Sequence, residues 1–204
     1  WSLLGQAYFQ LGTDKKSQSE KLNYYEKALE SMLSAVRTAE LEEYKPKENW
    51  YVLMAACYSE LEARIGKQES LYKQLDIYEI LVNLYPKKMY FIQLGGIYGQ
   101  LNRELDYMIT LNAAYQKDLL DKESEYLALT QLLLLNNNPY WAAKVLEAGR
   151  IKKVPVIDEK TKEEKILPVV KDNEKNLKLL ADAWRMAQEI ELAIPVMEKA
   201  AKLA

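Results

Sequence analysis

The chain has 204 residues, of which 49% are hydrophobic, and its 28 Lys and Arg against 30 Asp and Glu give a formal net charge of −2. The charges are spread along the chain, so no basic face for nucleic acid is expected, and no apolar run approaches the roughly 18 residues of a membrane span. Histidine is absent and Cys57 is the single cysteine, which excludes an internal disulfide and removes the commonest general base and metal ligand. We therefore expect a protein that is not an enzyme and has no catalytic residues, cofactor or metal site.

A helical string recurs along the chain, with a bulky residue followed at intervals of three by Leu-Gly, Tyr and Leu. It is clearest from Phe91 to Leu101, and related strings begin at Trp1, Tyr51, Tyr126 and Leu177. This spacing places the large residues on one face of a helix. The sequence therefore predicts five copies of one buried helix.

Each of these helices is followed by a second helical pattern with residues at positions i, i+4 and i+7. The pattern is most often small, large and small, so that a neighbouring helix can approach closely and the large residue fills the gap between helices. The five sets are Ala28, Met32 and Ala35; Gln74, Tyr78 and Leu81; Tyr107, Leu111 and Ala114; Ala142, Leu146 and Gly149; and Ala193, Met197 and Ala200.

The two-helix pattern resembles the tetratricopeptide repeat (TPR), whose period is about 34 residues. The resemblance implies an all-α fold, a right-handed α-solenoid of about five helix pairs. We expect a single array over residues 1–204, with repeats at 1–44, 47–86, 87–120, 122–150 and 173–204. The residues expected to be buried between helices are Leu4, Tyr8, Met54, Tyr58, Leu94, Tyr98, Leu129, Leu133, Leu180 and Trp184.

Residues 151–172 interrupt the period between the fourth and fifth repeats. Two β-branched segments, 154–157 and 166–170, flank the polar run 158–165, which predicts a β-hairpin-like insertion with an exposed ribbon because both segments contain proline. The alternatives are a solvated loop and an ordered flap that packs on the array or recruits a partner. The apolar residues in both arms favour the flap.

Three glycines, Gly95, Gly96 and Gly99, resemble a phosphate-binding turn, but they fall in the middle of a predicted helix rather than after a strand. Gly95 fits the position where the partner helix makes contact. Gly96 and Gly99 either allow the array to pack tightly on itself or leave the floor of a binding groove without side chains, and the sequence leaves both possibilities open. Trp50 and Trp141 lie outside the repeat register and are candidates for surface contact.

We expect a non-enzymatic scaffold that binds a partner peptide or helix in the concave groove formed by the first helices of the repeats. The alternatives are an accessory TPR domain of a larger enzyme or envelope-assembly protein, and a carbohydrate- or peptidoglycan-binding module, which would need exposed aromatic side chains. The predicted groove residues are Ala56, Ser59, Gly96, Gly99, Gln100, Gln131, Asp182 and Arg185.

Three segments also resemble the TPR proteins associated with TonB-type energy-transduction systems of Gram-negative bacteria: residues 81–88 with the helix after them, residues 138–147, and residues 176–181 with 193–201. The resemblance implies a periplasmic component that helps a TonB–ExbB–ExbD complex to power uptake through the outer membrane. The insertion at 151–172 does not match that family. Trp1 already lies inside a repeat, so we expect the sequence to be a piece of a longer protein.

Overall fold

A computed structural model describes residues 1–157 and 162–204, so residues 158–161 of the predicted polar run lie outside the described part. Contacts divide the chain into two compact units, Trp1–Arg103 and Glu104–Ala204. The boundary falls between the two helices of the predicted third repeat. The single array over 1–204 stays a prediction, and each unit is described by itself.

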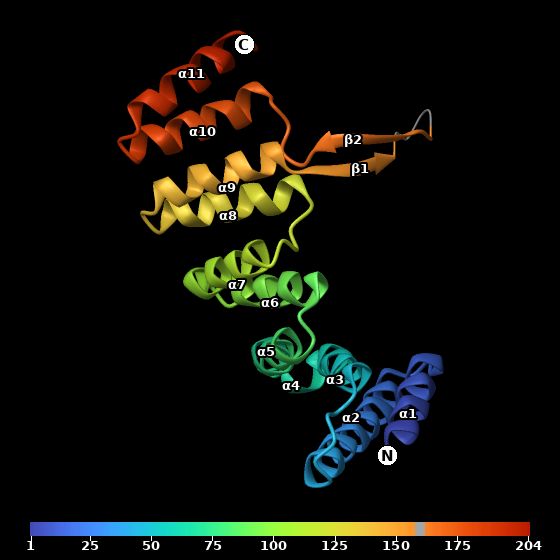
Figure 1. Cartoon of the computed structure of the whole chain (residues 1–204). Coiled ribbons are helices and arrows are strands. Elements are labelled where there is room, and N and C mark those ends of the chain that lie inside the picture. The colour runs from blue at the N-terminus through green and yellow to red at the C-terminus, as the bar shows by residue number, and fades with distance from the viewer. Residues whose placement is uncertain (158–161) are drawn as a thin grey trace. The chain divides into compact units, whose positions relative to one another are not determined.

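The first unit contains six helices, all within the described residues. Helix α1 packs on α2, α2 on α3, α3 on α5 and α5 on α6 (Figure 1). The short α4 is an extra turn between the two long helices of the second repeat. The bounds are α1 Ser2–Asp14, α2 Gln18–Leu41, α3 Glu48–Glu60, α4 Glu62–Ile65, α5 Lys67–Leu84 and α6 Lys88–Gln100.

The second unit has five helices and one two-stranded antiparallel sheet in its described residues. Successive helices pack together, α7 on α8, α8 on α9, α9 on α10 and α10 on α11. The bounds are α7 Glu104–Gln116, α8 Glu123–Leu135, α9 Pro139–Ile151, β1 Lys153–Ile157, β2 Glu164–Pro168, α10 Glu174–Met186 and α11 Ile190–Ala201. The predicted fold class is confirmed: an all-α solenoid of helix pairs, with a hairpin inserted between the fourth and fifth pairs.

Several helices end in the same type of turn, although no glycine occupies its left-handed position. The turn residues Glu43, Asn102, Asp118, Asn137 and Gln188 all have φ between 54° and 64°. After each of them, the next N–H donates to the carbonyl five residues earlier, as Arg103 does to Tyr98 at 2.9 Å. This is the Schellman arrangement, which satisfies carbonyls at a helix end and reverses the chain.

Most of the predicted core residues are buried. Met54, Leu94, Tyr98, Leu129, Leu133, Leu180 and Trp184 are buried, while Tyr8 and Tyr58 are half-buried. The prediction for Leu4 is wrong, because 42% of this residue is exposed. Helix α1 packs mainly on α2, so the other faces of α1 meet solvent.

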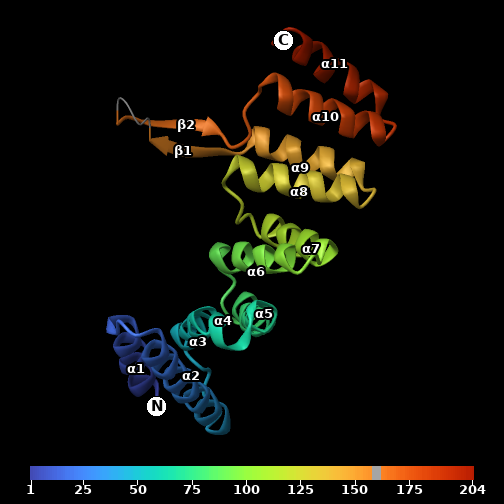
Figure 2. The ribbon, with the colours of Figure 1, turned by 180° about the vertical axis from the view of Figure 1, so that it is seen from behind.

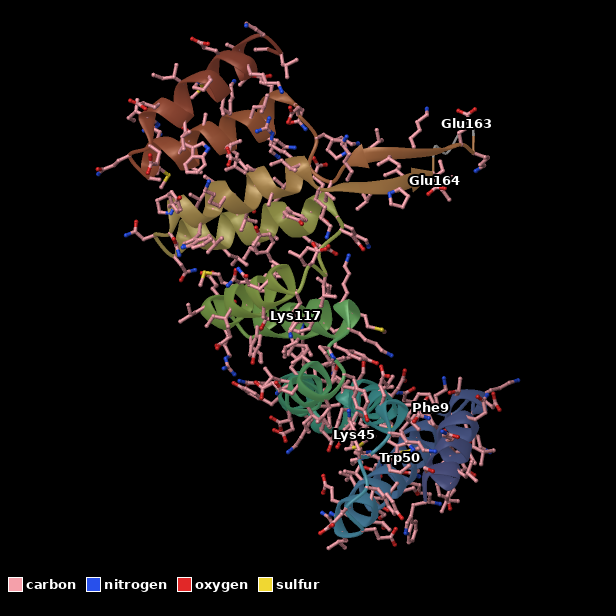
Figure 3. All side chains as sticks on the ribbon, in the orientation of Figure 1. Phe9, Lys45, Trp50, Lys117, Glu163 and Glu164 are labelled. Carbon is pink, nitrogen blue, oxygen red and sulfur yellow. The ribbon has the colours of Figure 1, made fainter. Side chains whose placement is uncertain are left out.

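The insertion forms an ordered hairpin whose strands are exposed. Val154 lies opposite Leu167 and Val156 opposite Lys165, and the hairpin stands clear of helices α8 to α11 in both views (Figures 1 and 2). Glu163 and Glu164 lie toward its end, away from the helices (Figure 3). The expectation that the flap packs on the array is therefore wrong for the two strands. Recruitment of a partner by the flap stays a prediction.

The segment that follows β2 anchors the hairpin to the helices. Val169 N–H donates to the carbonyl of Lys152 at 2.8 Å, and Val170 N–H donates to that of Gly149 at 2.9 Å. Both valines are buried. The position of the hairpin is therefore set at its base, by residues that belong to the helical core.

Asp172 reinforces this base by joining two helices. Its carboxylate accepts hydrogen bonds from Arg150 Nε at 2.6 Å and from an Arg150 terminal nitrogen at 3.0 Å, and it pairs with Lys199 of α11. The hydrogen bond from Arg150, followed by that from Lys199, lowers the pKa of Asp172 to about 2. The native fold therefore favours the ionised carboxylate.

We predict that the exposed strands are dispensable for folding. Replacing residues 153–168 by a two-residue turn while keeping Val169, Val170 and Asp172 should change the free energy of unfolding by less than about 1 kcal/mol, because loop-closure cost varies slowly with length. Removing residues 151–172 entirely should cost about 3 kcal/mol or more, since two buried valines and the ion pairs are lost as well. Urea denaturation of both variants measures the difference, and equal losses would contradict the distinction between strands and base.

We predict that Asp172→Asn destabilises the protein at neutral pH by roughly 1 kcal/mol, the scale of a partly exposed ion pair. The folded pKa of Asp172 lies below its ordinary value, so the stabilisation is complete above the unfolded pKa and is lost as pH falls through the folded pKa. The difference in unfolding free energy between wild type and variant should therefore shrink from pH 5 toward about pH 2. A difference that does not depend on pH would show that the ion pairs do not stabilise the fold.

Candidate functional site

The predicted groove residues of the first unit lie on α3 and α6, which are the first helices of their repeats. Val52, Ala56 and Ser59 follow one another along one face of α3 and are exposed or half-buried. On α6, Gly96, Gly99 and Gln100 are exposed together with Gln93. The α6 face consists of small or uncharged residues, whereas the α3 face also carries the exposed Glu60, four residues after Ala56.

Gly96 leaves the helix backbone of α6 open to solvent. A Cβ atom built at this position would have no neighbour within 4 Å. Among the described residues, nothing packs closely against Gly96, so tight packing of the array does not explain this glycine. The other explanation from the sequence, a groove floor without side chains, is the one that this geometry favours. Glycine costs a helix interior roughly 1 kcal/mol relative to alanine, so the bare surface is present at the expense of stability.

The opposite face of α6 holds the helix in this orientation. Tyr90, Phe91, Leu94, Ile97 and Tyr98 are buried on that face. The Tyr98 hydroxyl donates to Glu79 Oε1 of α5 at 2.5 Å, and the guanidinium of Arg103 lies 4.7 Å from the centre of its ring. These contacts fix the rotation of α6 about its axis and so keep Gly96 on the outside.

A polar cluster joins the start of α3 to the start of α6. Glu48 accepts hydrogen bonds from Lys87 Nζ at 2.7 Å and from the Tyr90 hydroxyl. The bonds from Lys87 and then Tyr90 lower the pKa of the Glu48 carboxyl, whereas burial and the bond to Glu48 raise the pKa of Tyr90 to about 12. Glu48 is therefore ionised and Tyr90 protonated at neutral pH, so the cluster positions the two helices.

In the second unit the predicted groove residues are Gln131 on α8 and Asp182 and Arg185 on α10. Gln131 and Arg185 are exposed and Asp182 is half-buried. Arg185 donates to Asp182 Oδ1 at 3.1 Å from a terminal nitrogen. The two charged residues satisfy each other along one turn of α10, so this helix presents a different chemistry from the uncharged face of α6.

Gln100 also lines a cavity of about 330 Å³ at the end of α6. Lys67, Gln68, Leu71 and Tyr72 from the start of α5 form its other wall. The cavity extends the exposed face of α6 toward polar side chains.

A larger cavity, of about 470 Å³, lies where α1, α2 and α3 meet. Its lining includes the aromatic residues Trp1, Tyr44 and Trp50 and also Lys45. Figure 3 labels Lys45 and Trp50. Trp1 and Tyr44 are 66% and 69% exposed. Exposed aromatic side chains are the feature that a carbohydrate-binding module would need, so that alternative stays open.

Cys57 has the environment of a structural residue. It is fully buried, and burial raises the pKa of its thiol to about 12. The thiol therefore stays protonated, and the nucleophilic thiolate is not formed at neutral pH.

Neither metal coordination nor membrane insertion is indicated by the described residues. Within residues 1–157 and 162–204, no group of three or more Cys, Asp or Glu side chains is placed to hold a metal ion. Over the same residues, no helix combines the length and the apolar character that crossing a membrane requires.

No protein-family model and no curated protein matches this sequence. Solved structures do resemble the fold. A crystal structure of the MamA protein aligns with a TM-score of 0.53 at 11% identity, covering 99% of this chain and 92% of that chain. A structure of MamA AMB-1 aligns with a TM-score of 0.52 at 13% identity, covering 98% and 92%.

A third structure, the MamA RS-1 ArsTM double mutant, aligns with a TM-score of 0.50 at 11% identity and covers 99% of this chain and 93% of that chain. Identities this low show the fold and nothing about partners. These structural alignments and the five helix pairs predicted from the repeat pattern together show that this chain has a TPR-type fold.

Proposed function

We propose that this chain is a non-enzymatic scaffold that binds an extended or helical segment of a partner protein on the exposed faces of α3 and α6. The observation that supports this most strongly is the open backbone at Gly96, where an added Cβ would touch nothing within 4 Å. A partner segment can approach a helix more closely where side chains are missing.

The chemistry of the α6 face supports an uncharged contact there. Along α3 the exposed or half-buried residues Val52, Ala56 and Ser59 are small, and along α6 Gln93 and Gln100 flank the glycines. Amide side chains can donate to and accept from a peptide backbone. A partner segment with apolar or neutral side chains fits the α6 face better than an acidic or basic one, because an unpaired charge would lose its water there without gaining a counter-charge.

The TPR-type fold supports the scaffold role in general terms. Stacked helix pairs present extended surfaces for binding and supply no reactive groups of their own. We place the catalytic alternative, an accessory domain of a larger enzyme, second.

For the identity of the partner, we propose a component of a TonB–ExbB–ExbD complex and a periplasmic location. This proposal rests on the sequence resemblance of residues 81–88, 138–147, 176–181 and 193–201 to TPR proteins of TonB systems. The likeness to MamA bears on the fold alone.

We predict that Gly96→Leu abolishes partner binding on this face while leaving the melting temperature unchanged or raised, since leucine favours helix over glycine. Gly96→Ala should raise the free energy of unfolding by about 1 kcal/mol and weaken binding less. Asp76→Leu, on an exposed position of α5, is the control for added surface leucine and should bind normally. A stably folded Gly96→Leu protein that binds its partner at full affinity would show that this face is not the site.

We predict that purified chain binds the periplasmic domain of TonB or of ExbD in isothermal titration calorimetry, and that Gly96→Leu removes the binding. Fractionation of cells that express the full-length protein should find it in the periplasm. If neither domain binds while another protein segment binds in a Gly96-dependent way, the TonB assignment is wrong and the scaffold function is retained.

A further inference from the structure

Trp141 lies over a cavity of about 250 Å³ between α7 and the start of α9. Met108 and Ile109 of α7 form the facing wall, and Leu133 at the end of α8 also lines the cavity. Trp141 is 52% exposed and Ile109 is 53% exposed, whereas Leu133 is buried. The cavity is therefore an apolar recess that opens to solvent beside a tryptophan.

Three carboxamide side chains also line this recess: Asn112, Gln116 and Asn138. Asn112 and Gln116 follow Met108 at intervals of four along one face of α7, and Asn138 precedes α9. Within the residues that the structure describes, none of the three side chains has a hydrogen-bond partner, and Asn138 does not cap α9 with its amide. Each amide therefore has donors and an acceptor available to a ligand.

None of the residues that line the recess is charged. A charged group entering it would lose hydration without meeting an opposite charge, which is costly. A neutral group with an apolar part and with amide donors and acceptors would satisfy both the apolar walls and the carboxamides. A peptide segment has this combination of groups.

The size of the recess sets how much of a peptide it holds. Its 250 Å³ is smaller than the roughly 300 Å³ at which pockets for small-molecule ligands begin, and it suits one large apolar side chain. Leu105, one turn before Ile109 on α7, is 55% exposed and continues the apolar surface beyond the recess.

We propose that this recess is a second binding site, separate from α3 and α6, for an extended and uncharged protein segment that inserts one large aliphatic or aromatic side chain beside Trp141. Asn112, Gln116 and Asn138 form hydrogen bonds with the backbone of that segment. In other modes of peptide recognition, too, main-chain hydrogen bonds contribute affinity and side-chain pockets contribute specificity. Trp141 provides the large, rigid contact area typical of residues that dominate binding energy. The scaffold then holds two protein segments, one on each unit.

The test is selection from a library of random 12-residue peptides displayed on phage, with the intact chain as the target. Ile109→Glu places a carboxylate in the apolar wall, and Ile190→Glu on α11 is its matched control, because Ile190 is 50% exposed and does not line the recess. Peptides with one Leu, Ile, Phe or Trp flanked by uncharged residues should be enriched. Their affinity should fall about tenfold or more on Ile109→Glu, in line with the cost of desolvating a charge, and stay unchanged on Ile190→Glu.

Three further measurements make the outcome decisive. The indole Nε1–H signal of Trp141, assigned by its absence in Trp141→Phe, should shift when a selected peptide is added, and Asn112→Ala with Gln116→Ala should weaken the peptide about tenfold through lost hydrogen bonds. Gly96→Leu should leave this binding unchanged. The proposal is overturned if no enriched peptide depends on Ile109, if charged anchors predominate, or if the Trp141 signal does not move.

Discussion

The close approach of paired helices is the constraint on which the rest of this structure depends. A Cβ atom at Gly149 would lie 2.6 Å from Cγ2 of Val170 and 2.7 Å from Cδ1 of Tyr126, and one at Gly5 would lie 2.8 Å from Cε of Met32. Real side chains do not tolerate such distances, so these positions require glycine or local rearrangement. At Gly149 one glycine lets α8 and α9 meet and also seats Val170, which fixes the hairpin and brings Asp172 to Arg150 and Lys199.

The same packing decides which surfaces remain for binding. The first helices place their large residues between helices, so the outer face of α6 keeps small and uncharged residues around Gly96. Helix α7 differs, because it buries Thr110, Leu111 and Ala114 and leaves Leu105 and Ile109 exposed. Ile109 lines the recess together with Trp141. The two proposed sites therefore differ in shape: the first is a bare helix face and the second is a recess for a single side chain.

Charged groups contribute mainly by positioning the ends of elements. Glu48 joins the starts of α3 and α6 through Lys87 and Tyr90, and Asp172 joins the base of the hairpin to α9 and α11. Partly exposed pairs of this kind add little free energy individually. Their effect is on geometry, since each one holds the end of one element against another.

The sequence by itself determined the helix pairs and the place of the insertion, because the spacing of residues such as Leu94 and Tyr98 requires a helix with one buried face. It also indicated Trp141 as a surface residue, since that residue lies outside the repeat register. It also predicted the exposed ribbon of the insertion, from the prolines in both of its arms. It did not reveal that Leu4 would be exposed, because burial depends on which helix covers a face. The sequence did not reveal the recess beside Trp141 either. Ile109, Asn112 and Asn138 belong to no common sequence motif, and they line one recess only when α7, α8 and α9 pack together. Periodicity is a local property that is visible in the sequence, whereas exposure and cavities arise from the packing of separate elements and are decided by the tertiary structure.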